Sequence, residues 1–165
     1  MSRDVTDDLL AHLTTGTPSF NTDAIPVTFG EGRIEHADYD DGPRYPSVAV
    51  VSADPVVPGG GPMDATGMDG SGDGVIQDVI ASVLVDCWGG THETDVYHDE
   101  GSNPDVVAKE LANEVHRVCF QTQPVQAPAG YELVNAAPPT PAHDTEASPT
   151  ARRYQTVCYL KYTNK

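Results

Sequence analysis

An acidic, glycine-rich segment near the middle of the chain has the spacing of a calcium-binding loop. Asp69, Ser71 and Asp73 stand at the first, third and fifth positions, where such loops supply oxygen ligands. Gly74 stands at the sixth, where the chain must turn, but the twelfth position is Ile80 instead of the glutamate that binds calcium through both oxygens. We therefore expect an acidic loop without a bound metal, and titration calorimetry should show no calcium binding tighter than millimolar.

A second acidic segment is dense in side chains that bind transition metals: His92, Glu93, Asp95, His98, Asp99 and Glu100. Its histidines follow the pattern His-Glu-x4-His, whereas zinc hydrolases use His-Glu-x2-His, which places both imidazoles on one face of a helix. Glycines on both sides of the segment favour a solvated loop. A small metal-dependent hydrolase or calcium module using residues 69–78 or 92–100 stays as the alternative function, and it would be a monomer that holds metal.

Nucleophilic catalysis is not favoured by the cysteine and histidine positions. His116 and Cys119 lie three residues apart on a predicted helix, but Cys119 falls on the buried stripe of that helix and no activating group accompanies it. The sequence contains no Walker loop, no GxSxG and no GxGxxG. We therefore expect a protein that is not an enzyme and needs no cofactor.

The elements that would position these segments centre on a strand predicted from Val79 to Trp88. Its alternate positions are all apolar, which gives the strand one dry face and one mixed face: Val79, Ala81, Val83, Val85 and Cys87. A helix follows, with Asn103 as N-cap, Pro104 as its first residue and Asp105 near the positive end of its dipole. Apolar residues then recur at helical spacing up to Cys119, so one face of this helix packs on a sheet and the other faces water.

Four further strands and one further helix are predicted around this unit. A short N-terminal helix is capped by Ser2 and ends before Gly16. The strands span residues 25–29, 46–52, 131–137 and 152–162, and the last alternates cleanly between a sealed face and an amphipathic face. The acidic connection from Gly30 to Tyr45 is interpreted as a hairpin turn or an open loop.

Two segments have the composition of connections without a hydrophobic period. Ten of the 29 glycines and prolines fall between Pro55 and Gly74, which predicts a long mobile loop at 54–78 projecting from the tip of a hairpin. A Pro-rich spacer is predicted at 138–151. The whole chain, residues 1–165, is then a single α+β domain: a mixed, mainly antiparallel β-sheet packed with an N-terminal helix and a central amphipathic helix.

The chain has a formal net charge of −16, from 25 acidic and 9 basic residues, and only three of the basic residues are lysines. Acid excess with scarce lysine is what we expect of a protein that stays hydrated in concentrated salt. An ordinary acidic surface that maintains solubility is the alternative. In either case the chain lacks the basic stripe that neutralises phosphates, which argues against a sequence-reading nucleic-acid binder.

The cysteines and the apolar segments indicate the compartment. Cys87, Cys119 and Cys158 are widely spaced in apolar segments and form no CxxC pair, so we expect reduced, buried thiols in a protein made in the cytoplasm. The N-terminal residues are too acidic for a signal peptide, and no stretch approaches the ~18 apolar residues of a membrane span. We therefore expect a soluble protein without a membrane partner.

The order of these elements resembles the tail terminator, or tail-completion, family of tailed viruses. In that pattern a short N-terminal helix precedes a strand like Tyr45-Pro-Ser-Val-Ala-Val, and a long variable loop leads to a strand like Val83-Leu-Val-Asp-Cys-Trp-Gly. A helix like Asp105-Val-Val-Ala-Lys-Glu-Leu-Ala-Asn-Glu-Val follows, and the chain closes on a strand pair ending in Arg153-Tyr-Gln-Thr-Val-Cys-Tyr-Leu-Lys-Tyr. The likeness covers most of the chain and rests on order and hydrophobic pattern rather than on invariant catalytic residues.

The resemblance implies a structural virion protein that assembles with itself as a ring, commonly a hexamer, at the head-proximal end of the tail tube. There it would bind the tail tube protein, end tube growth and join the tail to a neck or connector protein. DNA would pass through the pore without sequence-specific binding. Together with the acid excess, the resemblance implies a virus of a halophilic archaeon. Another neck or head-completion protein is the alternative within the virion.

Apolar side chains on the mixed strand faces are the candidate contacts of such a ring. A closed ring needs two different patches on each subunit, and these faces are more hydrophobic than a solvated surface requires. The interface candidates are Ile80, Leu84, Trp88, Arg153, Val157, Tyr159, Met63 and Met68. The alternative is that the N-terminal helix of the same chain covers this face of the sheet.

Overall fold

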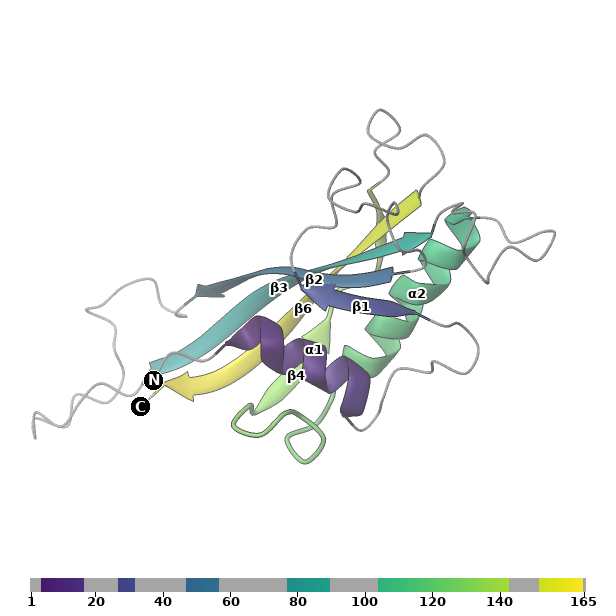
Figure 1. The fold of residues 1–165 in the computed structure, drawn as a ribbon. Coiled ribbons are helices and arrows are strands. Elements are labelled where there is room, and N and C mark those ends of the chain that lie inside the picture. The colour runs from purple at the N-terminus through teal and green to yellow at the C-terminus, as the bar shows by residue number, and fades with distance from the viewer. Residues whose placement is uncertain are drawn as a thin grey trace, which may run out of the picture.

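The computed structural model describes residues 4–16, 27–31, 47–56, 77–89, 104–142 and 152–164. Two helices and a mixed, mostly antiparallel six-stranded sheet make up this part of the chain, which confirms the α+β prediction (Figure 1). The elements are α1 (Val5–Thr15), β1 (Thr28–Glu31), β2 (Ser47–Val56), β3 (Gln77–Gly89), α2 (Pro104–Cys119), β4 (Leu133–Ala136), β5 (Thr140–Pro141) and β6 (Arg152–Asn164).

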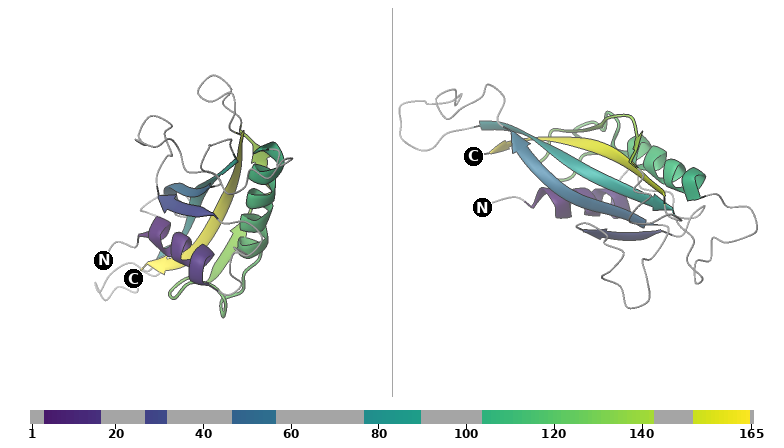
Figure 2. Two further views of the ribbon diagram at one scale, coloured as in Figure 1. Left: turned by 45° about the vertical axis from the view of Figure 1, so that its right-hand side comes forward. Right: turned by 90° about the horizontal axis from the view of Figure 1, so that it is seen from above.

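The two longest strands, β3 and β6, form the centre of the sheet. The strand order is β1-β2-β3-β6-β4, with β5 also paired to β6, and the views in Figure 2 show how strongly the long strands twist. Strands β3 and β6 pair antiparallel without interruption from Gln77↔Asn164 to Gly89↔Arg152. Strands β2 and β3 pair antiparallel as predicted, with a register shift between Val50 and Ser52.

The pairing of β1 with β2 corrects one prediction. These strands are parallel, with Thr28 opposite Ser47 and Glu31 opposite Val50. A tight hairpin can join only antiparallel neighbours, so the hairpin interpretation of the connection between them is wrong. The connecting residues 32–46 themselves lie outside the described part of the chain.

Both helices pack on one face of the sheet, which we call the inner face. The alternating apolar residues of β3 are buried there as predicted, together with their partners on β2, β4 and β6 and the apolar stripes of α1 and α2, in one core. The Thr156 hydroxyl of β6 donates to the Ala112 carbonyl of α2 at 3.5 Å, and the Tyr131 hydroxyl donates to Asp8 of α1 at 2.6 Å. Helix α1 contacts mainly β2 and β1 and also meets β3 and α2, whereas α2 contacts β3, β6 and β4. The alternative that α1 covers the mixed face is therefore wrong.

The ends of the helices follow from local chemistry. The N-cap of α1 is Asp4 and not Ser2: its carboxylate accepts from the Asp7 backbone N–H at 3.1 Å and from the Thr6 hydroxyl at 2.6 Å. Helix α2 begins at Pro104 as predicted, and Asn103 lies outside the described residues. Gly89, the last residue of β3, must lack a side chain because a Cβ there would stand 2.3 Å from the Pro104 carbonyl oxygen of α2.

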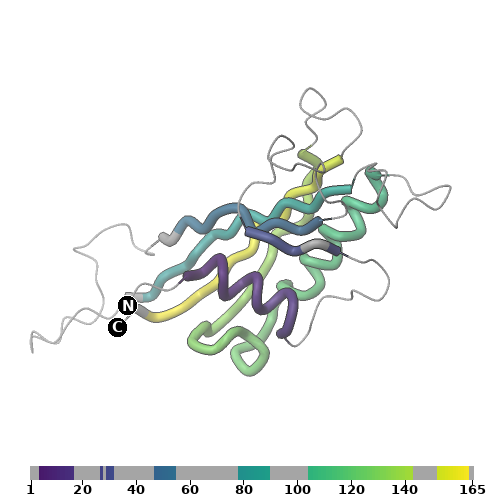
Figure 3. The backbone as a smooth tube through the Cα atoms, in the orientation of Figure 1, coloured from purple at the N-terminus to yellow at the C-terminus, as the bar shows by residue number. Residues whose placement is uncertain are grey.

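The described residues that follow α2, 120–142, form one edge of the sheet (Figure 3). The described part of the predicted Pro-rich spacer, residues 138–142, runs along β6: Thr140 pairs with Gln155, and the Ala142 N–H donates to the Arg153 carbonyl at 2.9 Å. Proline lacks the N–H that an added strand would need, so prolines at this edge limit further pairing. Residues 57–76, most of the predicted mobile loop, lie outside the described residues.

Candidate functional site

The sheet face opposite the helices, which we call the outer face, carries the predicted interface residues of β3 and β6. The antiparallel register places them in adjacent rows, because Leu84 stands opposite Val157 and Ser82 stands opposite Tyr159. Side chains two residues apart on one strand share a face, so Ile80 joins the same surface. The structure thus brings together predicted residues from segments that are far apart in the sequence.

Four of these residues form an apolar surface that we call the outer patch: Ile80, Leu84, Val157 and Tyr159. The side chains of Ile80 and Tyr159 are 36% and 39% exposed, and Leu84 and Val157 are half-buried. Exposed apolar residues are common singly, but a contiguous group of them on a sheet face is typical of a contact surface.

Trp88 and Arg153 also lie on the outer face, but they make contacts within their own chain. Trp88 is only 4% exposed, and the Arg153 guanidinium lies over its ring at 5.1 Å. Arg153 also donates through Nε to the Ala142 carbonyl at 2.8 Å. These two residues therefore belong to a packed end of the outer face and not to the exposed outer patch.

A buried carboxylate holds this packed end together. Asp86 is 1% exposed, and its Oδ2 lies 3.5 Å from Nη1 of Arg153. Gln155 donates through Nε2 to Oδ1 of Asp86 at 2.9 Å. Sequence reasoning did not single out Asp86 or Gln155, although a carboxylate inside a strongly apolar strand is a signal that it has a buried partner.

Charged side chains border the other end of the outer patch. Lys161 Nζ lies 3.0 Å from Glu132 and 3.9 Å from Asp78, and all three side chains are substantially exposed. Hydrogen bonds from Thr163 and Lys161 lower the pKa of Glu132, and the hydrogen bond to Glu132 raises the pKa of Lys161. Asp54 on β2 pairs in register with Ser82, so it adds a further exposed acid beside the patch.

The candidate metal ligands Asp69, Ser71 and Asp73, the segment 92–100, and the interface candidates Met63 and Met68 lie outside the described residues. Within the described ranges, an exposed acidic cluster sits where α1 begins beside β1: carboxylate oxygens of Asp4, Asp7 and Glu31 lie within 4.8 Å of one another. A hydrogen bond with Asp7 raises the pKa of Glu31, helped by desolvation and by repulsion from both aspartates. Exposed acids in this arrangement do not by themselves make a metal site.

The three cysteines are reduced and buried, as predicted. Burial raises the pKa of the Cys87 thiol well above its usual value, and a hydrogen bond with Cys119 does the same for Cys158. Cys119 is fully buried, while the His116 ring stacks on Phe120 with their centroids 4.9 Å apart. A thiol with a raised pKa is a poor nucleophile because little thiolate forms at neutral pH.

Neither helix in the described part of the chain is long and apolar enough to cross a membrane. Comparison of the chain with protein-family models, with curated proteins and with solved structures finds no match.

Proposed function

We propose that this protein is a structural subunit of a virion, a tail terminator that forms a ring at the head-proximal end of the tail tube. The ring would end tube growth, offer a surface to the neck or connector protein and let DNA pass through its pore. The observation that carries the proposal is the outer patch, because both helices in the described part of the chain pack on the inner face of the sheet.

A sheet with one face covered by helices and an exposed apolar patch on the other face is suited to assembly. Burying apolar area drives association, and a few central aromatic and aliphatic residues supply most of the binding energy of a typical interface. Tyr159 and Ile80 have the exposure that such residues need before assembly, and Leu84 and Val157 extend the same surface. The element order of the chain, which resembles that of tail terminators, supports a ring over other assemblies.

The net charge of −16 supports a setting in concentrated salt. At about 1 M salt the Debye length falls to roughly 3 Å, so repulsion between acidic subunits, and between a subunit and DNA in the pore, is largely screened. Assembly of such an acidic chain should therefore strengthen as salt rises. A virus of a halophilic archaeon fits this composition.

The test is an elongation assay with the tail tube protein of the same virus in molar salt. Wild-type protein should stop tube growth and appear as a ring at one tube end by negative-stain electron microscopy. Tyr159→Asp, which places a carboxylate in the outer patch, should lose capping. Val106→Asp is the matched control because Val106 is 49% exposed on α2, away from the sheet. Tubes that grow equally with and without wild-type protein would refute the proposal.

A further inference from the structure

The last turn of α1 carries a histidine inside the apolar core. His12 is only 3% exposed and lies on the buried stripe of the helix with Val5, Leu9 and Leu13. Its Nε2 is buried and has no hydrogen-bond partner in the described part of the chain. Most buried polar groups have such a partner, so this ring nitrogen is an exception in the core.

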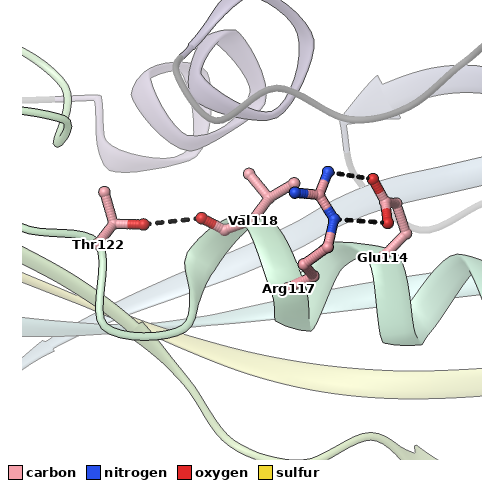
Figure 4. Close-up of polar contacts among 4 residues, drawn as sticks. All are labelled: Glu114, Arg117, Val118 and Thr122. Carbon is pink, nitrogen blue, oxygen red and sulfur yellow. Dashed lines mark hydrogen bonds and ion pairs between the residues drawn. The ribbon is translucent and has the colours of Figure 1, made fainter.

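Two backbone segments hold the His12 ring in place. On its own helix, a Cβ at Gly16 would stand 2.4 Å from Nδ1, so the ring lies against the turn that ends α1. On the neighbouring helix, the ring has a hydrogen bond with the Val118 backbone that favours its protonated form, which identifies the carbonyl as the acceptor. That carbonyl also accepts from the Thr122 hydroxyl at 2.7 Å, where α1 passes the end of α2 (Figure 4). His12 is therefore part of the contact between the two helices.

Charged groups on both helices have other partners. On α1, Asp8 stands one turn before His12 and accepts from the Tyr131 hydroxyl at 2.6 Å. At the end of α2, Arg117 forms paired hydrogen bonds with Glu114. These contacts hold the neighbouring charges in place without involving the His12 ring.

The other elements packed against α1 add thiols and one carboxylate. The titratable side chains on their inner side are Cys87 on β3, Cys119 on α2 and Glu31 on β1, which meets Asp4 and Asp7 at the opposite end of the helix. Burial of the ring prevails over the Val118 contact and lowers the pKa of His12. A proton taken up by His12 puts a charge into an apolar contact, and opening of that contact would return the charge to water.

Helix α1 can open without disturbing the centre of the fold. It contacts mainly β2 and β1, where it packs in the core with the fully buried Val48 and Val50 of β2. The continuous pairing of β3 with β6, and the packing of α2 on both strands, do not involve α1. Local opening of one peripheral element requires less free energy than unfolding of the whole protein.

We infer that α1 is a pH-sensitive cover of the inner face: it lifts from β2 when His12 takes up a proton from solvent, while β3, β6 and α2 stay folded. The open form presents the apolar inner side of β2, with Val48 and Val50, which the closed form buries completely. An apolar surface that appears only on acidification is accessible to a partner only in that state. This inference is independent of the proposed ring, because it concerns the face opposite the outer patch.

Hydrogen exchange of the full chain, read by mass spectrometry at constant molar salt, measures this opening. Between pH 7.5 and 5.5, after correction for the intrinsic exchange rate, peptides from α1 should lose protection while peptides from α2 keep theirs. The opening equilibrium should rise by up to about tenfold for each pH unit below 6.5, because opening takes up one proton. His12→Gln cannot take up the proton and should remove the rise. His116→Gln is the matched control and should keep it, because the His116 ring is half-buried and stacks on the exposed Phe120.

The wild-type protein gives a second readout that needs no variant. The rise should level off at the pH where the His12 ring of the folded protein titrates by NMR, and a rise that levels off elsewhere would overturn the inference. Equal loss of protection in α1 and α2 would mean global unfolding and would also overturn it, as would a rise that persists in His12→Gln. Protonation of Glu31 cannot imitate the effect, since it relieves repulsion with Asp4 and Asp7 and so favours the closed helix.

Discussion

Replacing Arg153 with Met should destabilise the protein far more than its partly exposed position suggests. The substitution keeps an aliphatic side chain against Trp88 but removes the guanidinium that faces the Asp86 carboxylate at 3.5 Å. Asp86 is 1% exposed, so water cannot replace the lost charge. Removing one partner of a buried ion pair typically costs about 3–5 kcal/mol, and we expect about 3 kcal/mol because Gln155 still donates to the carboxylate.

The opposite substitution should cost less, because the two partners differ in their surroundings. Asp86→Asn leaves an arginine that is 18% exposed and keeps the Ala142 carbonyl and the Trp88 ring, so we expect a loss of about 1–2 kcal/mol. The double variant should lose clearly less than the sum of the two single variants, since both single changes remove the same contact between Asp86 and Arg153.

Urea unfolding at constant salt, followed by fluorescence, measures these differences as changes in the free energy of unfolding. Lys161→Met is the matched control: it removes a cation from an exposed ion pair with Glu132 and should change stability much less. The reasoning is refuted if Arg153→Met and Lys161→Met cost the same, or if the two single losses simply add.

Three further perturbations follow from the buried and clustered groups. Burial lowers the pKa of His12 below 6.5, although a hydrogen bond with the Val118 backbone favours the protonated ring, so the free energy of unfolding should hold above pH 6.5 and fall as the pH drops through the lowered pKa. His12→Gln should flatten this decline in urea titrations between pH 7.5 and 5. Equal declines in the wild type and the variant would contradict the prediction. The pKa of Glu31 is raised, so the carboxyl stabilises the fold when it is protonated, and this stabilisation is lost as the pH rises above 4.5. Glu31→Gln should therefore raise the melting temperature at pH 7 in low salt, with no gain in molar salt or at low pH. Leu111 is fully buried between α2 and the sheet, so Leu111→Ala should lower the free energy of unfolding by about 2–5 kcal/mol. The three buried thiols should then react faster with a thiol reagent, because the core opens more often. An unchanged labelling rate would mean that the thiols become exposed without unfolding of this core.

The sequence alone was sufficient for the elements whose pattern is local. Alternation from Val79 to Cys87 predicted the buried face of β3, and helical spacing up to Cys119 predicted the buried stripe of α2 and its start at Pro104, because side-chain periodicity records which faces are buried. The first cap was missed because Ser2 and Asp4 are both good N-cap residues, and only the backbone conformation distinguishes them.

The tertiary structure decided which element covers which surface. Alternation shows that a strand has two different faces, but it does not say that α1 joins α2 on the inner face, or that β1 runs parallel to β2. Nor does it separate Trp88 and Arg153, which are packed over Asp86, from Ile80 and Tyr159, which stay exposed on the same face. These choices depend on contacts between residues far apart in the chain, whose free energy is set by three-dimensional packing and charge and leaves no period in the sequence.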